Sequence, residues 1–77
     1  MDIEHLVKMA NEIGAFFVTA NDEDTAAALI AEHLRRFWDP RMRKQIIEHL
    51  RQGGEGLKPA VGKAVGLLME GTTHKHG

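Results

Sequence analysis

The sequence predicts a small all-α domain, a bundle of three main helices with a weaker fourth helix at the C-terminal end. Apolar residues recur with a helical period in four segments. The breaks between these segments carry capping and turn residues. A chain of 77 residues leaves room for one hydrophobic core. We therefore expect a single domain over residues 1–70 and a disordered tail over residues 71–77.

The first helix is predicted from Ile3 to about Thr19. Its apolar residues follow the i, i+3, i+4, i+7 pattern of one buried face, namely Ile3, Leu6, Val7, Ala10, Ile13 and Phe17. Met9 and Phe16, seven residues apart, widen this stripe beyond half of the circumference. Either the helix is deeply buried between two other helices, or the Met9/Phe16 flank contacts another protein.

The second helix is predicted from about Asp24 to Phe37. The polar segment before it offers Asn21 or Asp22 as the N-cap, and clustered acids suit the positive end of a helix dipole. One side carries the apolar residues Ala27, Ile30, Ala31, Leu34 and the closing Phe37/Trp38 pair. The other side carries Glu32, His33, Arg35 and Arg36. Glu32 and Arg36 are four residues apart and suited to a solvated ion pair.

An Asp-Pro step divides the second helix from the third. Pro40 disfavours helical geometry at Asp39, so the second helix should end by Trp38. Asp39 can then cap a new helix whose first residue, Pro40, has no N–H to leave unpaired. We expect Phe37 in the core at this corner. Trp38 has two interpretations: it fills the core at the bend, or it stacks on a partner.

The third helix is predicted from Pro40 to about Gln52, before the C-cap signal of two glycines. Its apolar stripe consists of Met42, Ile46, Ile47 and Leu50. Arg43 falls inside this stripe, where an unpaired charge would be costly. Either Arg43 forms a partly buried ion pair with Asp39, one turn earlier, or it reaches an acidic group of a partner.

A flexible glycine-rich link leads to the last helix, predicted from Leu57 to about Met69. Its inward residues are Leu57, Ala60, Val61, Ala64 and Leu68. Gly62 and Gly66 lie on the opposite side. Each mid-helix glycine costs up to about 1 kcal/mol relative to alanine, so we expect this helix to be the weakest element.

Composition and charge narrow the function classes. The chain has no cysteine, which excludes disulfides and thiol chemistry. No apolar run approaches the length of a membrane span, and an acidic N-terminus is unlike a secretory signal, so we expect a cytoplasmic protein. Residues 1–34 carry a balance of −6 and residues 35–51 a balance of +4. This asymmetry indicates internal pairing or an oriented partner and is poor support for nucleic-acid binding.

Catalytic motifs are absent from the sequence. There is no serine, and the glycines at residues 53–56 lack the Lys-Ser/Thr of a phosphate-binding loop. His74 and His76 could catch a transition metal, but no third ligand stands at a set spacing. We expect a chain that is not an enzyme on its own and binds no metal or cofactor.

Three segments resemble the delta subunit of NAD-dependent, molybdenum-containing formate dehydrogenases. They are Leu6–Phe17, with its Met-Ala-Asn and Phe-Phe steps, then His33–Arg43 (HLRRFWDPRMR) and Gly56–Pro59 (GLKP). Phe-Trp-Asp-Pro between arginines is the most distinctive part, and the resemblance covers most of residues 5–65. The family has larger or charged residues where this chain has Gly62 and Gly66.

The resemblance implies a non-catalytic accessory subunit that associates with the catalytic alpha subunit and supports assembly or integrity of the complex. The molybdenum cofactor, iron–sulfur clusters, FMN and NAD are then expected in partner subunits. Our hypothesis is that a partner-binding surface docks on an acidic surface of the alpha subunit while a structural corner keeps its shape. The partner-binding residues are Arg35, Arg36, Trp38, Arg41, Met9 and Phe16, and the structural corner consists of Phe37, Asp39, Pro40 and Arg43.

Two alternatives stay open on the sequence alone. The chain could be a transient chaperone that inserts the molybdenum cofactor, with arginines gripping its phosphates. It could also be a small nucleic-acid-binding helical module, with the third helix as reader. Self-association of the isolated chain is left open as well.

Overall fold

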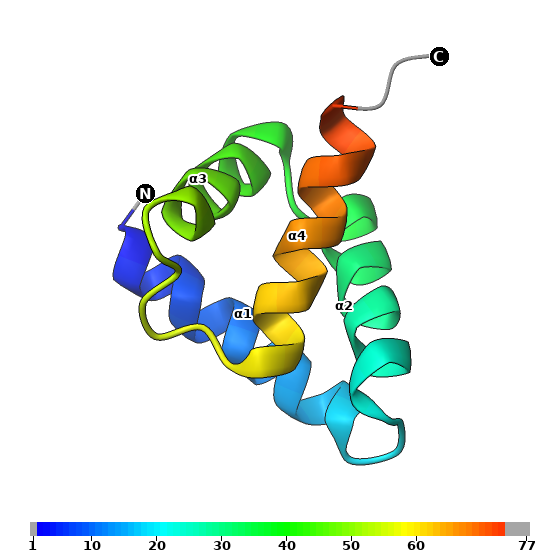
Figure 1. Cartoon of the computed structure of the whole chain (residues 1–77). Coiled ribbons are helices and arrows are strands. Elements are labelled where there is room, and N and C mark those ends of the chain that lie inside the picture. The colour runs from blue at the N-terminus through cyan, green and yellow to red at the C-terminus, as the bar shows by residue number, and fades with distance from the viewer. Residues whose placement is uncertain (1, 74–77) are drawn as a thin grey trace.

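The structure, a computed structural model, describes residues 2–73, which form four helices and no strand. The helices are α1 (Ile3–Val18), α2 (Glu23–Phe37), α3 (Pro40–Arg51) and α4 (Pro59–Thr73) (Figure 1). The predicted all-α fold and the order of its four helices are confirmed. α4 extends to Thr73, beyond the predicted end, and so includes the first residues that were assigned to a tail. Residues 74–77 lie outside the described residues.

α4 crosses the centre of the molecule and packs most extensively along α2 (Figure 1). It also contacts α1 and α3, so that one core is shared by all four helices. The largest fully buried side chains are Leu6, Ile30, Leu34, Ile46, Val61 and Val65. The helix with two mid-helix glycines therefore holds the centre of the bundle.

Capping residues mark the start and the end of α1 and the start of α2. The Asp2 carboxylate accepts from the backbone N–H of Glu4 at the start of α1. At its end, the Asn21 side chain donates to the carbonyl of Phe17 at 2.9 Å. Asp22 then takes the N-cap position of α2. Of the two predicted caps for α2, Asp22 holds the position, and Asn21 instead satisfies a carbonyl of the preceding helix.

The link between α3 and α4 is tied to α1 by one side chain. Gly53 and Gly54 have φ angles of 119° and 65°, which end α3 in the left-handed conformation that the two glycines predicted. The Asn11 side chain then donates to the carbonyl of Gly56 at 2.8 Å and accepts from the N–H of Lys58 at 3.0 Å. These bonds fix the direction in which the chain enters α4.

Two contacts set the position of α4 against its neighbours. Gly14 of α1 is buried against Val61, and a Cβ built at Gly14 would lie 2.4 Å from Cγ2 of Val61. On the other side, Lys63 pairs with Asp24 at 2.7 Å and Glu23 at 2.8 Å, and these bonds raise the pKa of Lys63. A Cβ at Gly62 or Gly66 would meet nothing within 4 Å, which confirms that both face away from the core.

Candidate partner-binding surface

The corner between α2 and α3 forms as predicted, with Asp39 as its hinge. α2 ends at Phe37, and Trp38 is extended with ψ of 140°. The Asp39 carboxylate accepts from the N–H of Met42 at 2.9 Å, and Pro40 is the first residue of α3. The Asp-Pro step therefore stops one helix and caps the next, as its residues predict.

The two aromatic residues of the corner, Phe37 and Trp38, differ strongly in solvent exposure. Trp38 is only 5% exposed, whereas Phe37 is 71% exposed. The expectation that Phe37 fills the core is wrong. The proposal of Trp38 as a partner contact is corrected as well, because its indole is buried within the chain and the core interpretation holds. Trp38 follows Leu34 by four residues, and its backbone N–H donates to the Leu34 carbonyl. Its side chain therefore continues the buried stripe of α2.

Arg43 is partly buried, as predicted, but it does not pair with Asp39. Its guanidinium donates to the backbone carbonyl of Arg35 at 3.0 Å and to that of Trp38. The reason is that the Asp39 carboxylate is already used as the cap of α3, while the last carbonyls of α2 need donors. A guanidinium also suits the negative end of the α2 dipole. Arg43 thus locks the corner by capping the helix that precedes it.

The other arginines of the corner remain at the surface. Arg36 lies 3.8 Å from Glu32, which confirms the predicted pair, and Arg35 lies 3.3 Å from the same carboxylate. Their side chains are 69% and 48% exposed. Arg41 is exposed and has no ion-pair partner among residues 2–73. Exposed pairs of this kind contribute little to stability, so these three cations are available to a partner.

The two residues of the Met9/Phe16 flank of α1 differ in burial. Met9 is half-buried and packs against the core, whereas Phe16 is 74% exposed. α1 contacts the three other helices, as the deep-burial interpretation requires. Phe16 nevertheless stays uncovered, so of the two residues it is the one that offers a surface.

Phe16 and Phe37 belong to one row of rings that crosses from α1 to α2. The ring centroids are 5.3 Å apart from Phe16 to Phe17, 6.1 Å from Phe17 to His33 and 4.7 Å from His33 to Phe37. We call these four residues the ring row. Its two middle members are half-buried and its two ends are exposed. The sequence predicts His33 on the polar side of the second helix, but its half-buried ring contacts Phe17 and Phe37. The spacing of four residues from Leu29 to His33 and from His33 to Phe37 indicates this edge of α2.

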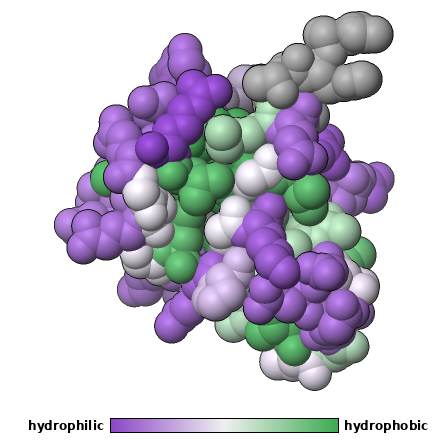
Figure 2. Space-filling view, in the orientation of Figure 1, coloured by the Kyte–Doolittle hydropathy of each residue, from purple (hydrophilic) through white to green (hydrophobic). Residues whose placement is uncertain are grey.

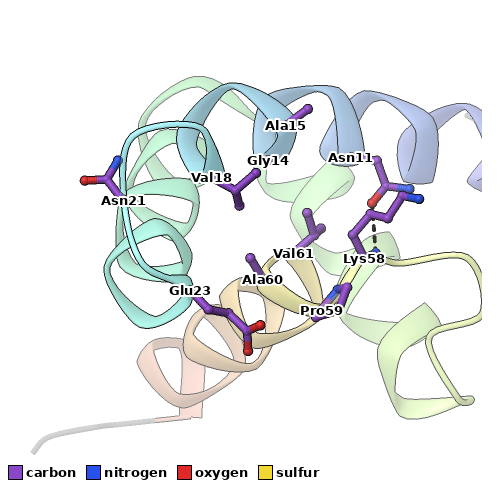
Figure 3. Close-up of a pocket in the computed structure, with 10 residues that line it drawn as sticks. All are labelled: Asn11, Gly14, Ala15, Val18, Asn21, Glu23, Lys58, Pro59, Ala60 and Val61. Carbon is purple, nitrogen blue, oxygen red and sulfur yellow. Dashed lines mark hydrogen bonds between the residues drawn. The ribbon is translucent and has the colours of Figure 1, made fainter.

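A groove of about 450 Å³ lies between the C-terminal half of α1 and the first turn of α4 (Figure 3). Its walls include Ala15, Val18, Pro59 and Ala60, and the Asn11–Lys58 hydrogen bond closes one end. The Asn11 amide is committed to the link on both of its polar atoms. Two charged residues, Glu23 and Lys58, also line the groove, and the Glu23 carboxylate is paired with Lys63 at 2.8 Å.

Neither a metal-binding cluster nor a membrane-spanning helix occurs within residues 2–73. The structure brings no three His, Asp or Glu side chains of this range into an arrangement that could hold a metal ion. None of the four helices within this range has the length and apolar character needed to cross a bilayer. Figure 2 shows hydrophilic residues around apolar patches on the face that carries α4 in Figure 1. His74 and His76 lie outside the described residues.

Comparison with known proteins gives one family. The family model described as the NADH-dependent formate dehydrogenase delta subunit FdsD matches residues 5–65. This range contains the corner, the ring row and the Asn11 contact with the link. No curated protein and no solved structure matched the chain.

Proposed function

The chain belongs to the FdsD family of formate dehydrogenase delta subunits, and from this premise we propose that it is a non-catalytic accessory subunit that docks on the catalytic alpha subunit. In this role it supports assembly or integrity of the active complex in the cytoplasm. The molybdenum cofactor, iron–sulfur clusters, FMN and NAD belong to the partner subunits. The chain itself contributes a rigid, shaped surface.

The observation that carries this proposal is the cationic corner. Arg35 and Arg36 in the last turn of α2 and Arg41 in the first turn of α3 are exposed on the two sides of the bend. The bend is fixed because Trp38 is buried and Arg43 caps α2. Arginine is enriched at protein interfaces and pairs with carboxylates through two parallel hydrogen bonds. The corner therefore suits an acidic surface of a larger protein.

Co-purification tests this role. The tagged chain is expressed in the native host, and the subunits that remain bound are identified by mass spectrometry. We expect the wild-type chain to retain the alpha subunit, and the double variant R35E/R41E to lose it while its helical circular dichroism and melting temperature stay close to wild type. R51E is the matched control, because Arg51 is an exposed arginine at the far end of α3.

Two outcomes would contradict parts of this proposal. Undiminished retention of the alpha subunit by R35E/R41E would remove the cationic corner as the docking site. Recovery of the chain only with alpha subunit that lacks its molybdenum cofactor would favour transient insertion of the cofactor over a permanent subunit. A fixed ratio to alpha in the mature complex supports the permanent role.

A further inference from the structure

Two members of the ring row, His33 and Phe37, belong to a second apolar edge of α2. The first edge is buried and contains Ile30 and Leu34. The second contains Leu29, His33 and Phe37, which are spaced by four residues and so follow one another along the helix. Leu29 is 38% exposed and Phe37 is 71% exposed. A helix of a small monomer needs one apolar face for its own core, so the second face requires another explanation.

Phe16 extends this edge onto α1. The contacts from Phe16 to Phe17, from Phe17 to His33 and from His33 to Phe37 hold the two exposed rings in fixed places. Single exposed apolar residues are normal on protein surfaces. Two phenylalanines that are each more than 70% exposed and joined by a continuous row of rings are instead typical of an interaction site. The row is also preorganised, which reduces the entropy lost on binding.

The charges beside the row indicate what covers it. Arg36 adjoins Phe37 in the sequence and follows His33 by one helical turn. It shares the Glu32 carboxylate with Arg35 and lies at the longer distance, 3.8 Å against 3.3 Å. Two guanidinium groups thus have one carboxylate between them on this part of α2. A carboxylate from another chain can complement Arg36 without breaking a strong internal pair.

We propose that the ring row is the docking site for an amphipathic, acidic segment of the formate dehydrogenase partner subunit. Apolar side chains of that segment pack on Phe16 and Phe37, and a carboxylate of the segment pairs with Arg36. This inference rests on the proposed function and deepens it, because it places the centre of the interface on the phenylalanines and assigns the arginines to its rim. Aromatic residues at the centre and charges at the rim are the usual order of a protein interface.

The test uses the full chain co-expressed with the other subunits of the complex. In the variant F16Q/F37Q both ends of the row become polar, and because both side chains are exposed the fold should be kept. We expect the dissociation constant for the partner subunits to rise by at least about tenfold, as is usual for truncated interface centres. The melting temperature should stay within a few degrees of wild type. Hydrogen exchange in the assembled complex should show protection at residues 13–17 and 29–37.

Matched controls lie elsewhere on the surface. Val18 is 45% exposed on α1 but lines the groove toward α4, and Leu67 is 36% exposed on α4. We expect V18Q and L67Q to bind the partner subunits within twofold of wild type. Equal losses for V18Q, L67Q and F16Q/F37Q would overturn the assignment to the ring row.

The remaining outcomes separate this inference from the proposed function. If wild-type chain and F16Q/F37Q retain the partner subunits equally well, the ring row is not the docking site and the accessory role stands. If wild-type chain retains no formate dehydrogenase subunit, the proposed function itself fails. If sedimentation shows a dimer of the isolated chain that F16Q/F37Q abolishes while binding to the complex is unchanged, a second copy covers the row and the inference is overturned.

Discussion

Phe37 and Trp38 are neighbours in the chain with opposite surroundings. The Trp38 indole is 5% exposed and belongs to the core, whereas the Phe37 ring is 71% exposed and lies against His33 at an angle of 42°. The difference arises because Trp38 follows the buried Leu34 by four residues, whereas Phe37 follows the half-buried His33 by four. Trp38 leaves the helix with an extended backbone and continues the line of Leu34, while Phe37 keeps its helical direction along the second edge. Phe37 thus presents a surface, and the next residue, Trp38, completes the core.

The largest expected effect separates these two aromatic residues. W38A should lower the free energy of unfolding by about 3–5 kcal/mol, because it removes the largest side chain from the core. F37A should change it by no more than about 0.5 kcal/mol, as is usual for an exposed position. Urea denaturation followed by circular dichroism measures both values. Similar losses of unfolding free energy in W38A and F37A would contradict the assignment of Trp38 to the core and of Phe37 to the surface.

A second comparison sets Arg43 against Arg41. R43M should cost about 1–3 kcal/mol, because the carbonyls of Arg35 and Trp38 lose their donor at the end of α2. R41M removes an exposed side chain without an ion pair among residues 2–73, and it should stay within about 0.5 kcal/mol of wild type. Urea denaturation followed by circular dichroism measures the free energies of unfolding of both variants. A neutral R43M would show that Arg43 does not hold the corner.

The glycines offer the third and smallest contrast. G14A places a methyl group against Val61, which is buried, and overpacking typically costs about 1–3 kcal/mol. Alanine returns up to about 1 kcal/mol in helix propensity, so we expect a net loss. G62A and G66A meet no atom within 4 Å, and each should gain about 0.5–1 kcal/mol. Thermal melts of the three single variants provide the measurement, and a stabilised G14A would contradict the close α1–α4 crossing.

The helices could be predicted from the sequence because their ends are set by local chemistry. The Asp39 cap, the first-turn Pro40 and the glycines at residues 53 and 54 act through bonds to residues a few positions away. Such bonds are encoded in short segments, so the order of the helices and most of their bounds follow from the residues alone. The inward residues of each helix follow from its period in the same way.

The orientation of the corner could not be predicted by the same reasoning. Projection at a fixed angle per residue gives the same side of α2 to Phe37 and Trp38, and it does not show that the packed bundle covers Trp38 and leaves Phe37 uncovered. The spacing of side chains also predicts that Arg43 pairs with Asp39. The backbone carbonyls that Arg43 binds instead cannot be identified from a pattern of side chains. Asn11 and Gly14 act across 45 or more residues, and contacts at that separation exist only once the helices are packed.

The environment of the single tryptophan tests most directly whether the corner is closed. Fluorescence quenching by acrylamide, measured on the folded chain and on the chain in denaturant, reports the exposure of Trp38 and of no other residue. A buried indole should give a blue-shifted emission in the folded chain, with quenching far below that of the denatured chain, and both values should be unchanged in F37Q. Quenching of the folded chain as strong as that of the denatured chain would contradict the burial of Trp38, because the corner would then be open.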